Sequence, residues 1–343
     1  SLERAYSEVH SPSSFESKDR ASDRIATEEY FLLVSAFKMI KGDKQSVRTH
    51  SYGVSSDDVK SFTGRFGFEF TDGQKKAVNE IFSDMKSPHI MNRLMQGDVG
   101  CGKTAVALCA AYLALKSGYQ VAFLAPTEVL AEQNYKLVQR YLPEFGSAFL
   151  SGSLSVKEKN AVKKSIACGD ADIVVGTHAI IQKNVEFARL ALCICDEQHR
   201  FGVAQRSSLL AKGDAPDLLV MSATPIPRTL SLIFYGDLDV TTIPDKPVAR
   251  AKIGTNVVPV VKYDGMYRFI SDEIAKGNKI YFVAPKIEDD PEGEIMSVTA
   301  LYDDLTERFP QSRILLLHGK MKDAEKREIM ENFKNGNGAI LVS

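Results

Sequence analysis

The chain has 343 residues, of which 43 are Lys or Arg and 44 are Asp or Glu, so its formal net charge is −1. This balance excludes a polybasic binder of the histone kind and an acidic solvating tail, but it allows a basic groove for nucleic acid on a neutral protein. Hydrophobic residues make up 44% and charged residues 25%, which is typical of a globular protein with about two domains. The longest apolar run, residues 105–115, is shorter than the roughly 18 residues that a membrane span needs.

The cysteines and histidines show no metal or redox spacing. Five cysteines stand at positions 101, 109, 168, 193 and 195. An odd number without a paired framework favours a reducing compartment, so we expect buried, unpaired thiols and a cytoplasmic protein. His50 is expected to be an ordinary surface residue.

A long amphipathic helix is predicted over residues 19–41, followed by a polar connection over residues 43–58. Strands and helices then alternate from about Phe66. Strands are predicted at 93–95, 120–125, 148–150, 173–176, 190–195 and 218–222, and helices at 104–116, 128–141, 156–167 and 201–212. Because these strands are apolar throughout, the pattern indicates a parallel sheet covered on both faces.

A proline-containing stretch at 241–250 marks a domain boundary, and a second, shorter series follows it. Its helices are predicted at 263–276, 296–309 and 322–335, and its strands at 279–284, 313–317 and 338–342. Three strands make a small sheet, so this second unit is expected to be incomplete. The predicted organisation is a linker helix segment at 1–50, a first lobe at 51–247 and a partial second lobe at 248–343.

Residues 97–104 read Gly-Asp-Val-Gly-Cys-Gly-Lys-Thr and satisfy the pattern G-x-x-x-x-G-K-[ST]. The run follows a predicted strand and opens a predicted helix, which is the context of a phosphate-binding loop. We expect Lys103 to reach the β and γ phosphates of ATP and Thr104 to bind Mg²⁺. The remaining residues expected to surround the phosphates are Gly97, Asp98, Val99, Gly100, Cys101 and Gly102.

A second motif is acidic: Asp196-Glu197 directly follows the predicted strand 190–195. Ligands of open parallel sheets bind at the carboxyl ends of strands. We therefore expect Asp196 to share Mg²⁺ with Thr104, and Glu197 to orient the attacking water. The predicted catalytic residues are Lys103, Asp196 and Glu197.

Several short motifs resemble those of superfamily 2 helicases. The Asp-Glu-Gln-His run at 196–199 resembles motif II and the Ser-Ala-Thr run at 222–224 resembles motif III, which implies coupling roles for Gln198, His199, Ser222, Thr224 and Arg228. The runs at 125–128 and 175–178 resemble motifs Ia and Ib, which implies that the DNA backbone is contacted by Thr127, Glu128, Gly176, Thr177 and His178.

Thr71 and Gln74 resemble the adenine-reading Q motif of the same superfamily. The resemblance implies that Gln74 bonds adenine and that Phe68 stacks on it. Phe66 and Phe70 are alternatives to Phe68, and core packing remains the other interpretation of these residues.

Longer runs at 196–203, 221–230 and 235–240 resemble the RecG family of bacterial branch-migration helicases. The resemblance implies an α/β P-loop NTPase with two RecA-like parallel-sheet lobes, the second incomplete, preceded by a long helix. It also implies that ATP and Mg²⁺ drive movement on duplex DNA at forks and four-way junctions during recombination and repair. The implied partner is branched DNA bound by a monomer, and a single-stranded-DNA-binding protein is a candidate partner.

The family's wedge domain and its later motor motifs, including an arginine finger, have no match in the sequence. An arginine finger is worth ~10³–10⁵ in the rate of phosphoryl transfer. The chain alone is therefore expected to bind ATP but to hydrolyse it poorly. Two alternatives remain open, namely a translocase of the Mfd type and a nucleotide-gated DNA-binding module without turnover.

Overall fold

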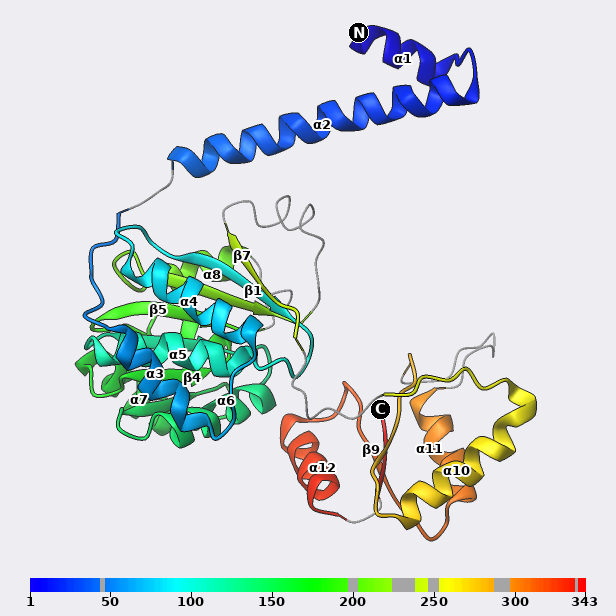
Figure 1. Cartoon of the computed structure of the whole chain (residues 1–343). Helices are drawn as coiled ribbons and strands as arrows, with labels where there is room; N and C mark the ends of the chain where they lie inside the picture. The colour runs from blue at the N-terminus through cyan, green and yellow to red at the C-terminus, as the bar shows by residue number, and fades with distance from the viewer. Residues whose placement is uncertain (44–46, 197–202, 224–237, 246–252, 287–296, 337–338) are drawn as a thin grey trace. The chain divides into compact units, whose positions relative to one another are not determined.

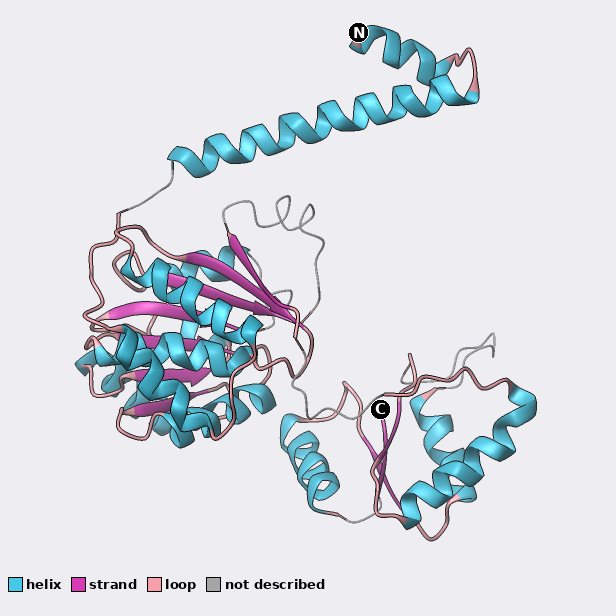
Figure 2. Ribbon diagram, in the orientation of Figure 1, coloured by secondary structure: helices cyan, strands magenta, loops and turns pink. Residues whose placement is uncertain are grey.

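The computed structural model describes residues 1–343 except for 44–46, 197–202, 224–237, 246–252, 287–296 and 337–338. The chain divides into two compact units, residues 1–250 and residues 251–343. Each unit contains its own parallel sheet with helices packed on it (Figure 2). Among the described helices, none combines the length and the apolar character needed to cross a bilayer.

Two helices precede the first sheet and pack against each other, α1 (Leu2–His10) and α2 (Phe15–Asp43). Helix α2 contains the predicted helix over residues 19–41 and extends beyond it at both ends. Helix α1 was not predicted, although its apolar residues recur at helical spacing; it is nine residues long and buries only Ala5. The side chain of Ser1 caps α1 by accepting a backbone N–H bond.

The sheet of the first unit has parallel strands in the order β3-β4-β2-β5-β6-β1-β7. Their bounds are β1 (Asn92–Gly97), β2 (Gln120–Leu124), β3 (Ser147–Leu150), β4 (Ile173–Gly176), β5 (Leu190–Cys195), β6 (Asp217–Ser222) and β7 (Asp239–Ile243). Strands β1 and β7 lie side by side at one edge of it (Figure 1). Strand β7 was not predicted, because its threonines gave it a polar sequence next to the expected boundary. It pairs with β1 at the edge of the sheet, where a strand can leave some of its residues exposed to solvent.

Helices cover both faces of this sheet, which confirms the predicted fold class. One face carries α3 (Ser56–Thr63), η1 (Gly64–Phe66), α4 (Asp72–Lys86), α5 (Lys103–Lys116) and α6 (Glu128–Tyr141), and the other carries α7 (Val156–Cys168), η2 (His178–Ile181) and α8 (Val203–Leu210). Strand β2 shows the alternation, since Val121 and Phe123 join the first core and Ala122 and Leu124 join the second. Four of the five cysteines are buried, and Cys168 is exposed.

The second unit has a smaller parallel sheet in the order β8-β10-β9. Its elements are η4 (Val260–Lys262), α10 (Tyr263–Ala275), β8 (Ile280–Phe282), α11 (Val298–Arg308), β9 (Arg313–Leu316), α12 (Asp323–Asn335) and β10 (Ala339–Val342). Ile340 of β10 packs in one core with Leu305 of α11, while Leu341 packs in another with Phe333 of α12. Helices therefore cover both faces of this sheet as well.

The connection predicted over residues 43–58 is polar but partly buried. The guanidinium of Arg48 donates to Asp217 Oδ1 at 3.0 Å, and the hydroxyl of Tyr52 donates to Asp217 Oδ2 at 2.7 Å. Asp217 begins β6, so these bonds fix the connection to the amino edge of the sheet. The side chain of His50 is 9% exposed beside Tyr52, and the prediction that it is a surface residue is wrong. Burial, reinforced by the nearby Arg48, lowers the pKa of His50 to about 4.

Candidate nucleotide site and nucleic-acid face

The phosphate-binding loop, residues 98–102, connects β1 to α5 at the carboxyl edge of the first sheet. Gly102 has a φ of +87°, and a Cβ atom there would collide with the side-chain amide of Gln74. Only glycine therefore fits this position. Nζ of Lys103 donates to the carbonyl oxygen of Gly97 at 2.7 Å, which holds the ammonium group against the loop backbone.

The loop is closed by its own hydrogen bonds. The N–H of Val99 donates to Asp98 Oδ1 at 2.7 Å, and the N–H of Cys101 donates to the Asp98 carbonyl at 3.2 Å. Gly100, between them, has a φ of +80°. Val99 is exposed, Cys101 is buried, and Thr104 is half-buried one residue into the helix. The backbone conformation that the sequence pattern requires is thus present.

Gln74 connects the start of α4 to this loop. Its Nε2 donates to the carbonyl of Cys101 at 2.8 Å, and its Oε1 accepts the N–H of Thr71 at 2.9 Å. The residue is 2% exposed, and both ends of its amide are bonded within the protein. Its role in adenine binding stays a prediction, and the amide retains a second N–H and a second oxygen lone pair that these two bonds do not use.

Phe68 differs from the other two aromatic candidates in exposure. It is 51% exposed, whereas Phe66 and Phe70 are buried in the core. Its ring contacts both Phe70 and Phe66, with centroids 5.7 Å apart in each pair, so a planar group could reach only the exposed part of the ring.

The strand order brings the acidic motif to the same edge as the loop. Strands β1 and β5 both pair with β6, so their ends lie about 10 Å apart, which is two strand spacings. Asp196 follows β5 and Ser222 ends β6, level with Gln96 of β1. Glu197, Gln198, His199, Thr224 and Arg228 lie outside the described residues, so their roles stay predictions.

Two residues at this edge were missed by the sequence analysis. Nδ2 of Asn134, buried on α6, donates to Asp196 Oδ2 at 3.3 Å and so orients that carboxylate. Oδ2 of Asp245, which follows β7, accepts the N–H of Gly73 at 2.6 Å, where a negative charge favours the start of α4. The available signals were a polar residue on an apolar helix face and an aspartate after a proline, and neither identifies its partner.

The residues expected to contact DNA follow the neighbouring strands β2 and β4. Thr127 caps α6 by accepting a backbone N–H at 3.3 Å, and Glu128 is half-buried beside it. Gly176 ends β4, and a Cβ atom there would collide with the end of β3. Thr177 is buried, with its N–H donating to β3 at 3.2 Å, whereas His178 is exposed. The sheet thus brings the five residues to one edge but leaves them unequally accessible.

A family model described as DEAD/DEAH box helicase matches residues 71–233. The chain is 42% identical over 340 residues to the ATP-dependent DNA helicase RecG of Streptococcus pneumoniae, covering 98% of this chain and 50% of that protein. It is 40% identical over 342 residues to RecG of Thermotoga maritima, covering 99% of this chain and 44% of that protein. The chain belongs to the RecG family.

Solved structures agree with this assignment. A structure of RecG bound to a three-way DNA junction matches with a TM-score of 0.80 and 35% identity, covering 98% of this RecG-family chain and 45% of that one. The DEAD-box helicase Mss116 matches with a TM-score of 0.64 and 20% identity, which shows a shared fold. The RecG-family chain spans about half the length of the relatives it matches.

Proposed function

We propose that the complete protein is an ATP-dependent DNA helicase that moves on duplex DNA and acts on forks and four-way junctions in recombination and repair. The observation that carries this proposal is a phosphate-binding loop and an acidic strand end at one sheet edge, in a chain similar to RecG proteins along nearly its whole length. A RecG protein bound to a three-way DNA junction is a structural relative and supports the choice of substrate. We also propose that the protein works as a monomer in the cytoplasm, where its DNA lies.

The residues at this edge fit Mg²⁺ and ATP. Thr104 and Asp196 offer the oxygen ligands that Mg²⁺ prefers. Among the described residues, no three or more His, Cys, Asp or Glu side chains lie close enough together to hold a metal ion. Mg²⁺ would therefore take its other ligands from phosphate and water, as it commonly does. Bound ATP would supply the phosphoanhydride bond whose hydrolysis drives movement.

The protein contributes position and charge to that reaction. Lys103, now bonded to the Gly97 carbonyl, would donate to phosphate oxygens and stabilise their negative charge in the transition state. Glu197 would orient the attacking water, while Phe68 and Gln74 would hold the adenine. Such positioning supplies most of the catalysis in phosphoryl transfer.

The two lobes would then convert hydrolysis into movement. We assign residues 51–247 to the ATP-binding lobe and residues 248–343 to part of the second lobe. Nucleotide-dependent changes between lobes would move the DNA-contacting residues along the backbone, coupled through Ser222 and the neighbouring motifs. We propose that the chain alone binds ATP but hydrolyses it poorly, since its sequence lacks a match to the arginine-finger motif.

The deciding experiment is ATP turnover by the complete protein on forked DNA and on linear duplex of equal length and base composition. Selective stimulation by the fork is the expected result. Equal stimulation by both substrates would indicate a duplex translocase of the Mfd type. If neither substrate stimulates ATP turnover, the helicase proposal fails and the protein is a nucleotide-binding module.

A further inference from the structure

Glu128, at the start of α6, binds the turn that follows β3. The hydroxyl of Ser151 donates to Glu128 Oε1 at 3.0 Å, and the hydroxyl of Ser153 donates to the same oxygen. The two serine oxygens lie 3.0 Å apart. One carboxylate oxygen on α6 therefore accepts hydrogen bonds from two hydroxyls of the turn that follows β3.

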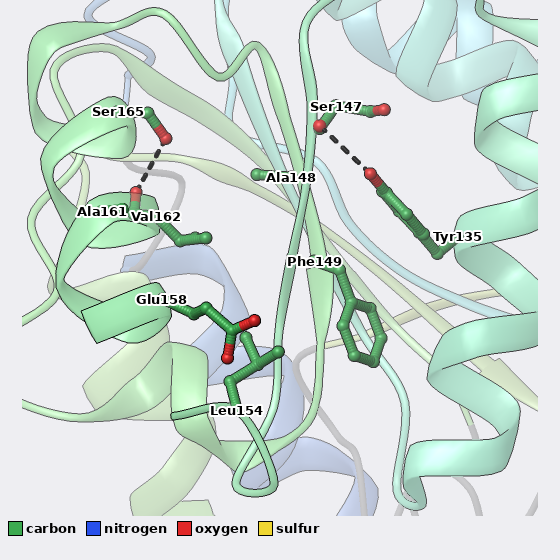
Figure 3. Close-up of a pocket in the computed structure, with 9 residues that line it drawn as sticks. All are labelled: Tyr135, Ser147, Ala148, Phe149, Leu154, Glu158, Ala161, Val162 and Ser165. Carbon is green, nitrogen blue, oxygen red and sulfur yellow. Dashed lines mark hydrogen bonds between the residues drawn. The ribbon is translucent and has the colours of Figure 1, made fainter. Parts of the chain in front are cut away.

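The rest of this turn, residues 151–155, is also fixed. Nζ of Lys159 donates to the carbonyl of Gly152 at 2.6 Å. Leu154 faces the apolar pocket beside β3, close to Glu158 (Figure 3). Ser155 caps α7 by accepting the N–H of Glu158 at 3.3 Å, and the Glu158 carboxylate accepts the N–H of Ser155 at 2.9 Å. Gly152, Ser153 and Ser155 are exposed, whereas Ser151 is buried and Leu154 is half-buried.

The turn is continuous with the residues expected to contact DNA. The N–H of Thr177 donates to the carbonyl of Leu150, the last residue of β3, at 3.2 Å. Glu128 itself follows Thr127 at the end of β2. The turn, which follows the edge strand β3, is therefore in contact with one and next to the other of two segments that the proposed function places on the DNA backbone.

The charge of Glu128 argues against direct contact with that backbone, because a carboxylate repels phosphate. We propose instead that Glu128 is a positioning residue, which holds the turn at 151–155 so that Gly152 and Ser153 contact a DNA phosphate. This inference rests on the proposed function. In it, the backbone N–H groups of the turn donate to phosphate, while Glu128 keeps the two serine hydroxyls in place.

The sign of the effect on DNA affinity distinguishes this role from simple electrostatics. Removing a negative charge beside a polyanion would by itself tighten binding. If Glu128 positions the turn, Glu128→Ala should instead raise the Kd for forked duplex about tenfold, the usual size of a lost hydrogen bond to a charged group. It should raise the KM for DNA in the ATPase assay and leave kcat and ATP affinity near their original values. Glu128→Gln keeps an acceptor oxygen and should recover most of the affinity.

Glu186→Gln is the matched control, because it removes an exposed carboxylate near the start of β5, away from the turn. It should leave the affinity for forked duplex unchanged or slightly tighter. The double variant Ser151→Ala/Ser153→Ala should reproduce the loss seen with Glu128→Ala, and adding Glu128→Ala to it should cause little further loss.

Tighter or unchanged DNA binding by Glu128→Ala would overturn the proposal, as would additive losses in the triple variant. Unchanged ATP affinity separates a local effect from misfolding. If the unaltered protein is stimulated by forks and Glu128→Ala behaves identically, only the positioning role fails. If the unaltered protein neither binds forks nor responds to them, the proposed function fails as well.

Discussion

Lys103 and Glu197 have separable predicted roles at the nucleotide. Lys103→Ala removes the positive charge at the loop and should weaken ATP binding about tenfold or more, as expected for lost hydrogen bonds to charged groups. Glu197→Gln keeps the size of the side chain and should preserve ATP binding while lowering turnover about 10²–10⁴-fold. Titration with a fluorescent ATP analogue and phosphate release in the complete protein check both. Indistinguishable behaviour of the two variants would contradict the assignment.

Gly102 gives a second test at the residue scale, because its backbone and its surroundings both exclude a side chain. Gly102→Ala would place a Cβ atom at a φ of +87° and against Gln74. We expect a loss of about 1–3 kcal/mol in the free energy of unfolding and impaired ATP binding.

Gly64→Ala is the control for this substitution. Gly64 has a φ of −63° and open space around its Cβ position. Alanine there should leave ATP binding intact and stability unchanged or raised by up to about 1 kcal/mol. Equal effects of the two substitutions in urea unfolding would show that the loop does not need the left-handed conformation.

The sequence predicts individual candidate residues, but it does not predict the residues that contact them. Lys103 and Thr104 follow from a local pattern whose physical demands are met within eight residues. The bond from Asn134 to Asp196 joins positions 62 residues apart, and that from Gly73 to Asp245 joins positions 172 apart. No local pattern encodes such pairs, because they arise only when the sheet brings strand ends together.

At the scale of elements, apolar strands and periodic helices were predictable, whereas marginal ones were not. Strand β5 is buried along its whole length and its bounds agree with the prediction. Strand β7 is buried only at Thr241 and Ile243, so its sequence lacks a strong apolar pattern. Helix α1 does repeat apolar residues at helical spacing, but it is short and buries only Ala5. The low exposure of His50 was missed because its ring packs beside Tyr119, a residue far away in sequence, with ring centroids 5.2 Å apart.

The connection at residues 47–54 should make stability depend on pH through His50. Its pKa is lowered to about 4 in the folded protein, from an ordinary value of 6.5. Below pH 6.5 His50 is protonated in the unfolded chain but stays neutral in the folded chain. The free energy of unfolding therefore falls as the pH falls, by at most ~1.4 kcal/mol per pH unit. Burial raises the pKa of Asp217, which has the opposite effect on stability. Substituting His50 alone is therefore needed to separate the two contributions.

Urea unfolding at pH 7, 6 and 5 measures this dependence. His50→Gln should flatten it, whereas His10→Gln, on the exposed end of α1, should leave it as in the unaltered protein. If His50→Gln has the same pH dependence as the unaltered protein, the buried neutral histidine is not its source.

At the scale of the whole molecule, the two units have separate cores, and we expect them to unfold separately. The second unit, residues 251–343, is smaller and buries fewer apolar side chains, so its transition should come at the lower temperature. Leu305→Ala should lower the midpoint temperature of that transition only, because replacing a fully buried leucine with alanine lowers the free energy of unfolding by about 2–5 kcal/mol.

ATP provides the complementary test, because the proposed nucleotide residues described in the structure belong to the first unit. ATP with Mg²⁺ at 100 times its Kd should stabilise that unit by about 2.7 kcal/mol and raise only the higher transition. Lys103→Ala should abolish this shift at the same ATP concentration. Differential scanning calorimetry with and without nucleotide measures both transitions in one experiment. A single transition that moves as a whole with ATP and with Leu305→Ala would mean that the two cores unfold as one cooperative body.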